Sequence, residues 1–174
     1  SNKWLLVADL GLSIVFVYKF DEREGTISGA SNSSRHLALP KSAGARHVAF
    51  SPDGENIAYI TCEMSSQLVT AKLDDKTGIL SLVSSTTTLP PYLQPTRDHH
   101  EGDSAIEFYK DFIYVCVRAT KPGQIALFKK SNPTAPPTLL AHFSSHGDIP
   151  RHILVLQDEN VLLCANQESN IITA

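Results

Sequence analysis

An internal repeat of about 50 residues is the feature that most constrains the fold of this chain. The segment 7–27, VADLGLSIVFVYKFDEREGTI, aligns without a gap with 60–80, ITCEMSSQLVTAKLDDKTGIL. Two further copies follow, 112–130 with a short insertion and 161–174 up to the last residue of the sequence. One equivalent position in the four copies is occupied by Leu10, Glu63, Arg118 and Gln167. The repeat must therefore form the structural unit.

Each copy is typical of short β-strands joined by tight turns. The clearest one, Arg46–Val83, places Pro, Asp and Gly at two chain reversals, Ser51–Gly54 and Asp74–Gly78. The 3.6-residue periodicity of helical repeats is absent, as is the Gly-His/Trp-Asp pair of WD-type repeats. The four strands expected in this copy are 46–50, 57–62, 68–73 and 79–83. Four antiparallel strands in so short a stretch describe one blade, so we predict an all-β fold, a β-propeller of four-stranded antiparallel blades.

A second recurrence identifies the innermost strand of each blade. Arg46-His47-Val48 recurs as Arg151-His152-Ile153 two repeats later, and Ala105–Phe108 fills the intermediate position. The blade parts predicted within a single segment, 1–174, are 3–45, 46–90, 104–145 and 150–174. A closed propeller has about four to eight blades, so we predict three to four blades of a larger ring, incomplete at both ends. Missing blades or a second copy are expected to cover the open sheet edges.

The composition argues against several classes of partner. Apolar residues make up 42% and charged residues 19%, and the net charge of −3 gives no reason to expect nucleic acid or a membrane as a partner. No apolar run approaches the roughly 20 residues of a membrane helix, and no signal peptide is visible before the first strand. Cys62, Cys116 and Cys164 lie in apolar runs, so we predict buried, reduced thiols and a cytoplasmic protein.

Four segments carry a resemblance to a known family. They are GARHVAFSPDGENIAYITCEMSSQLVTAKLDDKTGIL, DSAIEF, YVCVRATKPGQIALF and IPRHILVLQDENVLLCANQESNII. Over nearly the whole chain they resemble the lactonase family of seven-bladed β-propellers, which includes bacterial-type 6-phosphogluconolactonase and the fungal carboxy-cis,cis-muconate lactonising enzyme. The resemblance implies a hydrolase of carbohydrate metabolism that opens a sugar lactone of 6-phosphogluconolactone type without a cofactor. The alternatives are a 3-carboxymuconate cyclase-like isomerase and a non-catalytic binding scaffold.

Propeller geometry predicts where the chemistry lies, because the innermost strands line the central channel and the loops at one end of the blades open on one face. We expect a funnel that binds a small anionic lactone or carboxylate, since arginine suits carboxylate or phosphate and histidine transfers protons near neutral pH. The catalytic candidates are His47, Glu107 and Arg118. The substrate-binding candidates are Arg46, Glu63, Arg97, Arg151, His152, Asn166 and Gln167. The last two are expected to support the site by hydrogen bonds, and a functional acid at Glu107 is implied by the resemblance.

Some of these residues have a structural alternative. For His47 and His152 it is a channel-lining imidazole satisfied by backbone groups. For Arg118 it is an ion pair to a neighbouring blade, through Glu63 or Glu107, because a lone buried arginine is costly.

The loop Arg97–Asp103 contains two histidines and three acids, which makes it a candidate metal site. Consecutive histidines seldom converge on one ion, so we expect a solvated or substrate-covering loop and no metal. Cys62 and Val117 stand where the family has asparagine, and the turn between Glu107 and Phe112 is shortened. These departures predict an altered binding face.

Overall fold

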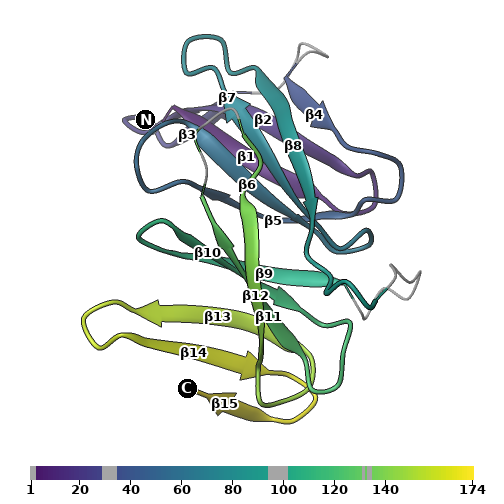
Figure 1. The fold of residues 1–174 in the computed structure, drawn as a ribbon. Coiled ribbons are helices and arrows are strands. Elements are labelled where there is room, and N and C mark those ends of the chain that lie inside the picture. Colours follow the sequence, from purple (N-terminus) through teal and green to yellow (C-terminus); the bar gives the residue numbers. More distant parts are fainter. Residues whose placement is uncertain (1–2, 29–34, 94–101, 131, 133–134) are drawn as a thin grey trace.

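Strands are the regular elements of the structure, a computed structural model that describes residues 3–28, 35–93, 102–130, 132 and 135–174 (Figure 1). The strands pair in antiparallel fashion within four separate sheets. The predicted all-β fold of four-stranded antiparallel blades is therefore confirmed. Within the described residues, no helix is long and apolar enough to cross a membrane.

The four sheets follow one another along the chain. The first contains β1 (Trp4–Asp9), β2 (Ile14–Asp21), β3 (Thr26–Ser28) and β4 (His36–Ala38). The second contains β5 (Ala45–Phe50), β6 (Ile57–Cys62), β7 (Gln67–Leu73) and β8 (Leu80–Thr87). The third contains β9 (Asp103–Tyr109), β10 (Phe112–Val117), β11 (Gln124–Lys129) and β12 (Thr138–Ser144). The fourth contains β13 (Pro150–Leu156), β14 (Val161–Asn166) and β15 (Ile171–Thr173).

The second sheet is the blade predicted from 46–83. Its strands pair in the order β5-β6-β7-β8, and β6 has the predicted limits. β8 extends beyond the expected Val83 to Thr87, because Thr86 and Thr87 continue the pairing with Leu68 and Gln67. A polar outer strand has no apolar pattern that would mark its end.

The first sheet, within the described residues, lacks an innermost strand and has its outer strand in two pieces. β3 pairs with one end of β2 at Lys19–Asp21, and β4 pairs with the other end at Ile14–Phe16. β1 matches β6 of the complete blade, and β2 matches β7. The first element of this sheet is therefore equivalent to a second strand, as the repeat register predicts.

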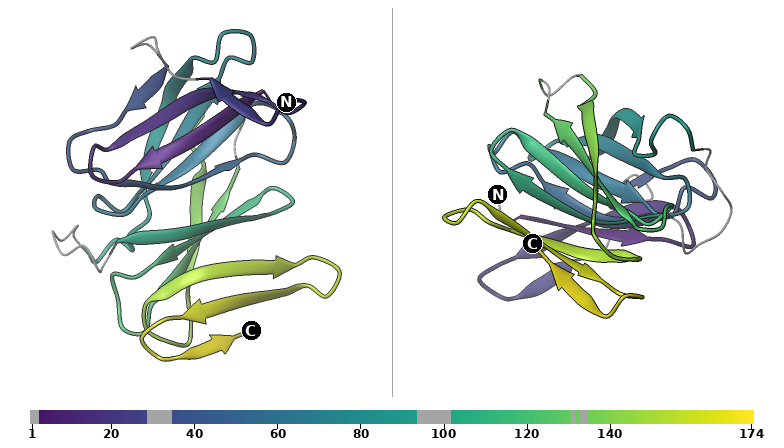
Figure 2. Two further views of the ribbon diagram at one scale, coloured as in Figure 1. Left: turned by 180° about the vertical axis from the view of Figure 1, so that it is seen from behind. Right: turned by 60° about the horizontal axis from the view of Figure 1, so that its bottom comes forward.

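The sheets stack face to face, with the first (purple) and the fourth (yellow) at opposite ends of the stack (Figures 1 and 2). β5 contacts β1 on one side and β9 on the other, and β9 contacts β13. The innermost strands β5, β9 and β13 thus lie side by side, which is the arrangement that lines a channel in a propeller.

Apolar clusters fill the spaces between adjacent sheets. Val15 and Val17 pack with Ile60 between the first two sheets, and Phe128 packs with Tyr59 between the second and third. The three cysteines are buried free thiols, as predicted. Cys116 and Cys164 share the cluster between the third and fourth sheets. Because each central sheet is covered on both faces, its middle strands are nearly continuous apolar runs, which explains why the repeat is visible in the sequence.

The β9–β10 hairpin is shorter than the equivalent β5–β6 hairpin, as predicted. Tyr109 pairs with Phe112 across a turn of two residues, and Lys110 adopts a φ of 54°. In β5–β6 the last pair is Phe50 with Ala58. This turn lies at the end of β9 away from Asp103.

Candidate active site

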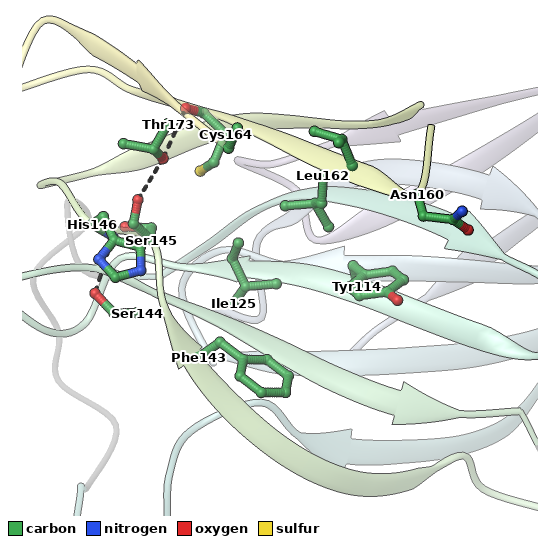
Figure 3. A pocket seen from close by; sticks show the side chains of 12 residues that line it. Tyr114, Ile125, Phe143, Ser144, Ser145, His146, Asn160, Leu162, Cys164 and Thr173 are labelled. Carbon is green, nitrogen blue, oxygen red and sulfur yellow. Dashed lines mark hydrogen bonds between the residues drawn. The ribbon is translucent and has the colours of Figure 1, made fainter. Parts of the chain in front are cut away.

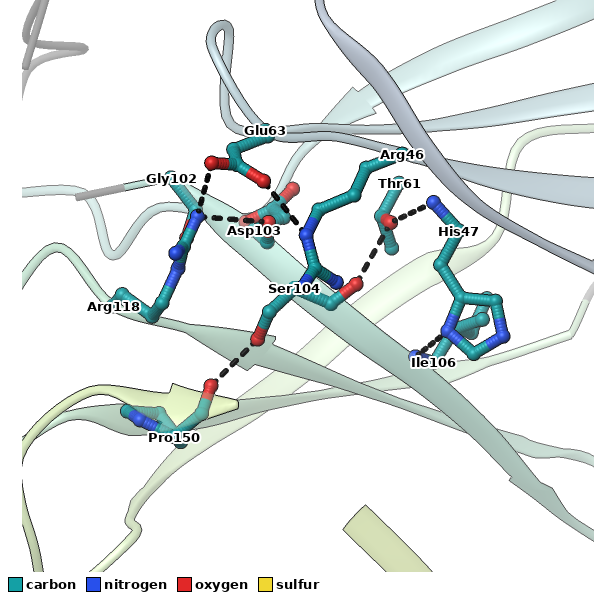
Figure 4. A network of polar contacts seen from close by, with 10 residues as sticks. All are labelled: Arg46, His47, Thr61, Glu63, Gly102, Asp103, Ser104, Ile106, Arg118 and Pro150. Atoms are coloured by element: carbon teal, nitrogen blue, oxygen red, sulfur yellow. Dashed lines mark hydrogen bonds and ion pairs between the residues drawn. The ribbon is translucent and has the colours of Figure 1, made fainter. Parts of the chain in front are cut away.

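Glu63 joins two arginines that come from adjacent sheets (Figure 4). Its Oε2 lies 2.7 Å from Nε of Arg46, which is on β5. Its Oε1 lies 2.9 Å from Nη2 of Arg118, which directly follows β10. Glu63 itself directly follows β6, so the three side chains meet where the inner strands begin and the second strands end.

Arg118 is buried to 2% exposure, and its Nε and Nη2 donors have partners. Besides the contact with Glu63, its Nε donates to the Gly102 carbonyl oxygen at 2.8 Å and its Nη2 to the Asp103 carbonyl oxygen at 3.4 Å. A buried guanidinium needs such partners. This geometry is the inter-blade ion pair considered as an alternative for Arg118.

Gly102 is required at its place because its backbone lies directly against that of Glu63. A Cβ atom at Gly102 would overlap the Glu63 carbonyl oxygen, which no side chain can tolerate. The close approach brings the start of β9 beneath the Arg46–Glu63–Arg118 group. Arg97, the substrate-binding candidate of the preceding loop, lies outside the described residues.

The three inner strands share a β-bulge at the same height. The pairing of β5 with β6 shifts between Ala45 and His47, so Arg46 is the extra residue. The pairing of β13 with β14 shifts between Pro150 and His152, so Arg151 is the extra residue. The pairing of β9 with β10 is irregular as well. Bulges redirect side chains and are common beside active sites. Here the bulges take Arg46 and Arg151 out of the regular alternation of side chains between the two faces of the sheet.

Two buried hydroxyls connect the bulged strands (Figure 4). Thr61 Oγ1 accepts from the His47 backbone N–H at 3.2 Å and donates to the Ser104 carbonyl oxygen at 3.0 Å. Ser104 Oγ in turn donates to the Pro150 carbonyl oxygen. The hydrogen bonds thus pass from β5 to β9 to β13, and they fix the relative positions of the inner strands. The sequence reasoning identified neither residue.

His47 is half-buried and its Nδ1 accepts a hydrogen bond of 3.3 Å from the Ile106 backbone N–H. Because Nδ1 is an acceptor there, the ring proton of the neutral imidazole is on Nε2. Burial lowers the pKa of His47, the positive charges of Arg46 and His152 lower it further, and Glu107 partly opposes them. At neutral pH the side chain is therefore a neutral donor through Nε2.

Glu107 lies on β9 close enough to act electrostatically on His47. Its Oε1 accepts from the Phe108 backbone N–H at 3.0 Å, and its side chain is half-buried. Arg151 and His152 of β13 are exposed. Arg151 lowers the pKa of Arg46, although burial is the larger cause. The inner strands of three sheets therefore bring these charged side chains to one region.

Asn166 and Gln167 lie apart from the Arg46–Glu63–Arg118 group. Asn166 is buried, and its Nδ2 donates to the Ser145 carbonyl oxygen at 3.0 Å and to Thr173 Oγ1 at 3.1 Å. Gln167 is exposed. Both line a hollow of about 350 Å³ together with Arg151. Asn166 thus links β14 to β15 within the fourth sheet and to the residue that follows β12 of the third sheet.

Asp103, the first residue of β9, is a site component that sequence reasoning passed over as part of a loop. It is fully buried, and its Oδ1 accepts from Thr88 Oγ1 at 2.7 Å. Burial raises the pKa of Asp103 to about 8, against the opposing effects of the Thr88 hydrogen bond and Arg118. The register places it opposite Val117 as Ala45 is placed opposite Cys62. A comparison of the repeats at this position would have revealed an acid in place of a small apolar residue.

A second cavity of about 350 Å³ lies between the third and fourth sheets (Figure 3). Its walls are mainly apolar, with Ile125, Phe143 and Leu162 among them, and no arginine, aspartate or glutamate side chain lines it within the described residues. Thr173 Oγ1 in its lining already donates to the Ser145 carbonyl oxygen at 2.7 Å. The cavity therefore lacks the charged side chains for acyl chemistry that the inner-strand region supplies.

Metal ligands are not gathered in the part of the chain that the structure describes, where no group of three or more His, Cys, Asp or Glu side chains is suited to an ion. Most of the loop 97–103 lies outside that part. The described site offers instead neutral and cationic donors, His47 and Arg46, beside the carboxylate of Glu107. Such a set can bind an anion, stabilise an oxyanion and accept a proton from water.

A family described as "Lactonase, 7-bladed beta-propeller" matches residues 1–174. An uncharacterized protein of Lactococcus lactis subsp. cremoris is 28% identical over 173 residues, which are 97% of this chain and 47% of that protein. The chain thus spans about half the length of the curated relatives that it matches.

Two solved structures have the same fold. A protein from Lactobacillus plantarum is 30% identical, with a TM-score of 0.82 over 98% of this chain and 47% of that one. The periplasmic gluconolactonase of Pseudomonas aeruginosa is 25% identical, with a TM-score of 0.83 over 98% of this chain and 46% of that one.

Proposed function

The chain belongs to the lactonase family of seven-bladed β-propellers, and on that premise we propose that the complete protein hydrolyses a sugar lactone at the inner-strand region around Arg46, His47 and Glu107. The main support is the hydrogen bond that the Ile106 backbone N–H donates to His47 Nδ1. Because Nδ1 is occupied as an acceptor, Nε2–H is the ring donor available to a substrate. The similarity to a gluconolactonase supports an aldonolactone as the substrate class. A phosphorylated lactone is the finer form of the same proposal.

Hydrolysis requires a nucleophilic water and stabilisation of the oxyanion that forms at the lactone carbonyl. We assign the water to the carboxylate of Glu107, whose Oε1 is held by the Phe108 N–H. We assign the oxyanion to His47 Nε2–H. A neutral imidazole suits this role because its proton stays on the donor atom as negative charge develops. His47 is kept neutral by burial and by Arg46.

The product of lactone opening is a carboxylate, and arginine binds it. Arg46 donates Nε to Glu63, which fixes its guanidinium plane. Arg151 is exposed on the equivalent bulge of β13, which lies on the other side of β9. In this proposal the two arginines bind the developing carboxylate, while Arg118 acts through Glu63 to hold Arg46 in place. The roles of His152, Asn166 and Gln167 are then to surround Arg151.

Steady-state kinetics of the full-length protein with glucono-δ-lactone test the assignment. We expect His47→Gln to lower kcat about 100- to 1,000-fold, as for loss of an oxyanion donor. Glu107→Gln should lower kcat about 100- to 10,000-fold. His36→Gln is the matched control, because His36 lies on the outer strand β4, and it should leave kcat unchanged. Wild-type turnover that survives both site substitutions would contradict the proposal, and gluconate binding without turnover would indicate a binding scaffold.

We also propose that further blades cover the two ends of the stack. Ile171 and Ile172 of β15 are 45% and 73% exposed, and Leu154 of β13 is 46% exposed. Exposed apolar residues on a sheet favour a covering partner. The relatives' greater length favours more blades over a second copy. A monomer mass for the full-length protein in sedimentation supports this, whereas an obligate dimer supports the second copy.

Three buried free thiols support a cytoplasmic location, although the Pseudomonas aeruginosa relative is periplasmic. Fractionation of cells that express the full-length protein distinguishes the two compartments. A periplasmic result would overturn this part of the proposal without affecting the assignment of the site.

A further inference from the structure

We propose that Asp103 determines the specificity of the site for anions: held as a neutral acid, it leaves one net positive charge beside Arg46 for a monocarboxylate, and its ionisation removes that charge. The inference rests on the proposed function in that the carboxylate is the product of lactone opening. Asp103 would not touch the substrate and would act through the net charge that it shares with Arg46, Arg118 and Glu63.

The hydrogen bonds of Asp103 indicate a protonated side chain. Its Oδ1 accepts from Thr88 Oγ1 at 2.7 Å, whereas its Oδ2 is buried and has no hydrogen-bond partner within the described residues. An ionised carboxylate only accepts hydrogen bonds, and a buried one without donors at one oxygen carries a large desolvation cost. A neutral acid avoids most of that cost.

The neighbouring arginine does not satisfy the Asp103 side chain. Arg118 directs Nε to the Gly102 carbonyl oxygen and Nη2 to Glu63 and the Asp103 carbonyl oxygen, so these donors go to the backbone and to the other acid. Thr88 is fixed on its far side, where its carbonyl oxygen lies 2.7 Å from His142 Nε2. Within the described residues, the donor that reaches the Asp103 carboxyl group is thus a neutral hydroxyl.

Among the described residues, charged groups from several elements lie around Asp103, while Arg151 and His152 of β13, which also packs against β9, are exposed. β5 contributes Arg46, the ends of β6 and β10 contribute Glu63 and Arg118, and β12 contributes His142 through Thr88. The Cys62 thiol also faces Asp103, and burial raises its pKa to about 12, so it stays neutral. Of the described residues that act on Asp103, Arg46, Arg118 and Glu63 carry a net charge of +1, which ionised Asp103 would cancel.

Electrostatics agree with the hydrogen bonding. Burial is the largest cause that raises the pKa of Asp103, and Glu63 raises it further, while Thr88, Arg118 and Arg46 lower it. Since the resulting pKa is about 8, the acid is mainly neutral at pH 7 and ionises as the pH rises through 8. The positive charge available to an anion is therefore present below this range and lost above it.

Two measurements on the full-length protein test the proposal. Infrared spectroscopy should show the carbonyl band of a protonated carboxylic acid at pH 7 that disappears by pH 9 and is missing in Asp103→Asn. Calorimetric titration with gluconate, whose own charge is constant in this range, should show about tenfold weaker binding at pH 9 than at pH 7. In Asp103→Asn the affinity should change less than about twofold, because the amide stays neutral.

Two further variants keep the test specific. Asp53→Asn, in the turn after β5, is the matched control and should retain the wild-type pH dependence. Thr88→Val removes the hydrogen bond to Oδ1 and should move the loss of affinity to higher pH. The pH dependence of gluconate binding by the wild-type protein needs no variant, so a folding defect in any of these substitutions leaves the proposal testable.

The outcomes separate this inference from the proposed hydrolysis. A missing carboxylic-acid band at pH 7, a wild-type affinity that does not change with pH, or a wild-type pH dependence in Asp103→Asn would each overturn the inference. The absence of gluconate binding at any pH would also overturn it. If binding behaves as expected but no lactone is turned over, the hydrolase proposal fails and the inference stands.

Discussion

The substitution Glu63→Gln tests whether the Arg46–Glu63–Arg118 group holds two blades together. Glu63 has 12% of its side chain exposed and is paired with the nearly inaccessible Arg118 at 2.9 Å and with Arg46 at 2.7 Å. Removing one partner of a buried ion pair costs about 3–5 kcal/mol, because the other charge stays buried. The amide oxygen of the introduced glutamine can still accept one hydrogen bond, and Arg118 keeps its hydrogen bonds to two backbone carbonyls. We therefore expect the free energy of unfolding to fall by an amount at the low end of this range, about 3 kcal/mol.

The matched control for this substitution is Asp53→Asn. Asp53 pairs with Lys130 at 2.7 Å, also across two sheets, but 35% of its side chain is exposed. A pair this exposed contributes about 0–1 kcal/mol. Both variants remove one charge from an inter-sheet ion pair and keep the shape of the side chain. The difference between their losses of free energy of unfolding therefore measures how much burial of the ion pair contributes.

Urea unfolding of the full-length variants gives the free energies of unfolding. We expect Glu63→Gln to lie about 2 kcal/mol or more below Asp53→Asn at pH 7. Loss of the Glu63 charge also removes a repulsion that raises the pKa of Asp103. In the variant Asp103 therefore ionises more readily beside Arg118, and the difference in free energy of unfolding from the wild type should become smaller at higher pH. Equal losses for the two variants would show that solvent screens the Arg46–Glu63–Arg118 group, and that it does not act as a buried ion pair.

Three other substitutions or conditions give distinct outcomes. Gly102→Ala would place a Cβ on top of the Glu63 carbonyl oxygen, so thermal unfolding should show a severely destabilised protein; a wild-type melting temperature would contradict the close approach. Asn166→Ala loses a buried and a partly buried hydrogen bond and should cost about 1–3 kcal/mol in urea unfolding with unchanged kcat, whereas a loss of kcat at full stability would mean that Asn166 serves the site directly. Because the pKa of His47 is lowered from 6.5, its imidazole is mainly neutral at pH 6.5. Protonation of Nδ1 at lower pH would break the hydrogen bond from Ile106 that holds the ring, so kcat should fall there and this decline should disappear in His47→Gln.

The repeat carried most of the information about the fold. The limits predicted for β6 agree with those observed, Ile57–Cys62, because a strand buried between two neighbouring sheets is a continuous apolar run bounded by turn residues. The outer strands are harder to predict. β8 is longer than expected, since its last residues are threonines whose pairing with β7 gives no apolar signal.

The site was only partly accessible from the sequence. Arg46, Glu63 and Arg118 could be placed on one face from their equivalent positions in the repeats, but not the fact that Glu63 bridges the other two. The bulges at Arg46 and Arg151 depend on how two strands pair, which a single strand does not reveal. Asp103 was missed because its surroundings include Thr88 and Arg118, which are distant in sequence.

The location of the site is tested most directly by a crystal structure of the full-length protein with bound gluconate. We expect the ligand carboxylate between Arg46 and Arg151, with the ligand within hydrogen-bond reach of His47 Nε2. A ligand found instead in the apolar cavity beside Phe143, or bound without contact to either arginine, would contradict the assignment of this region as the active site.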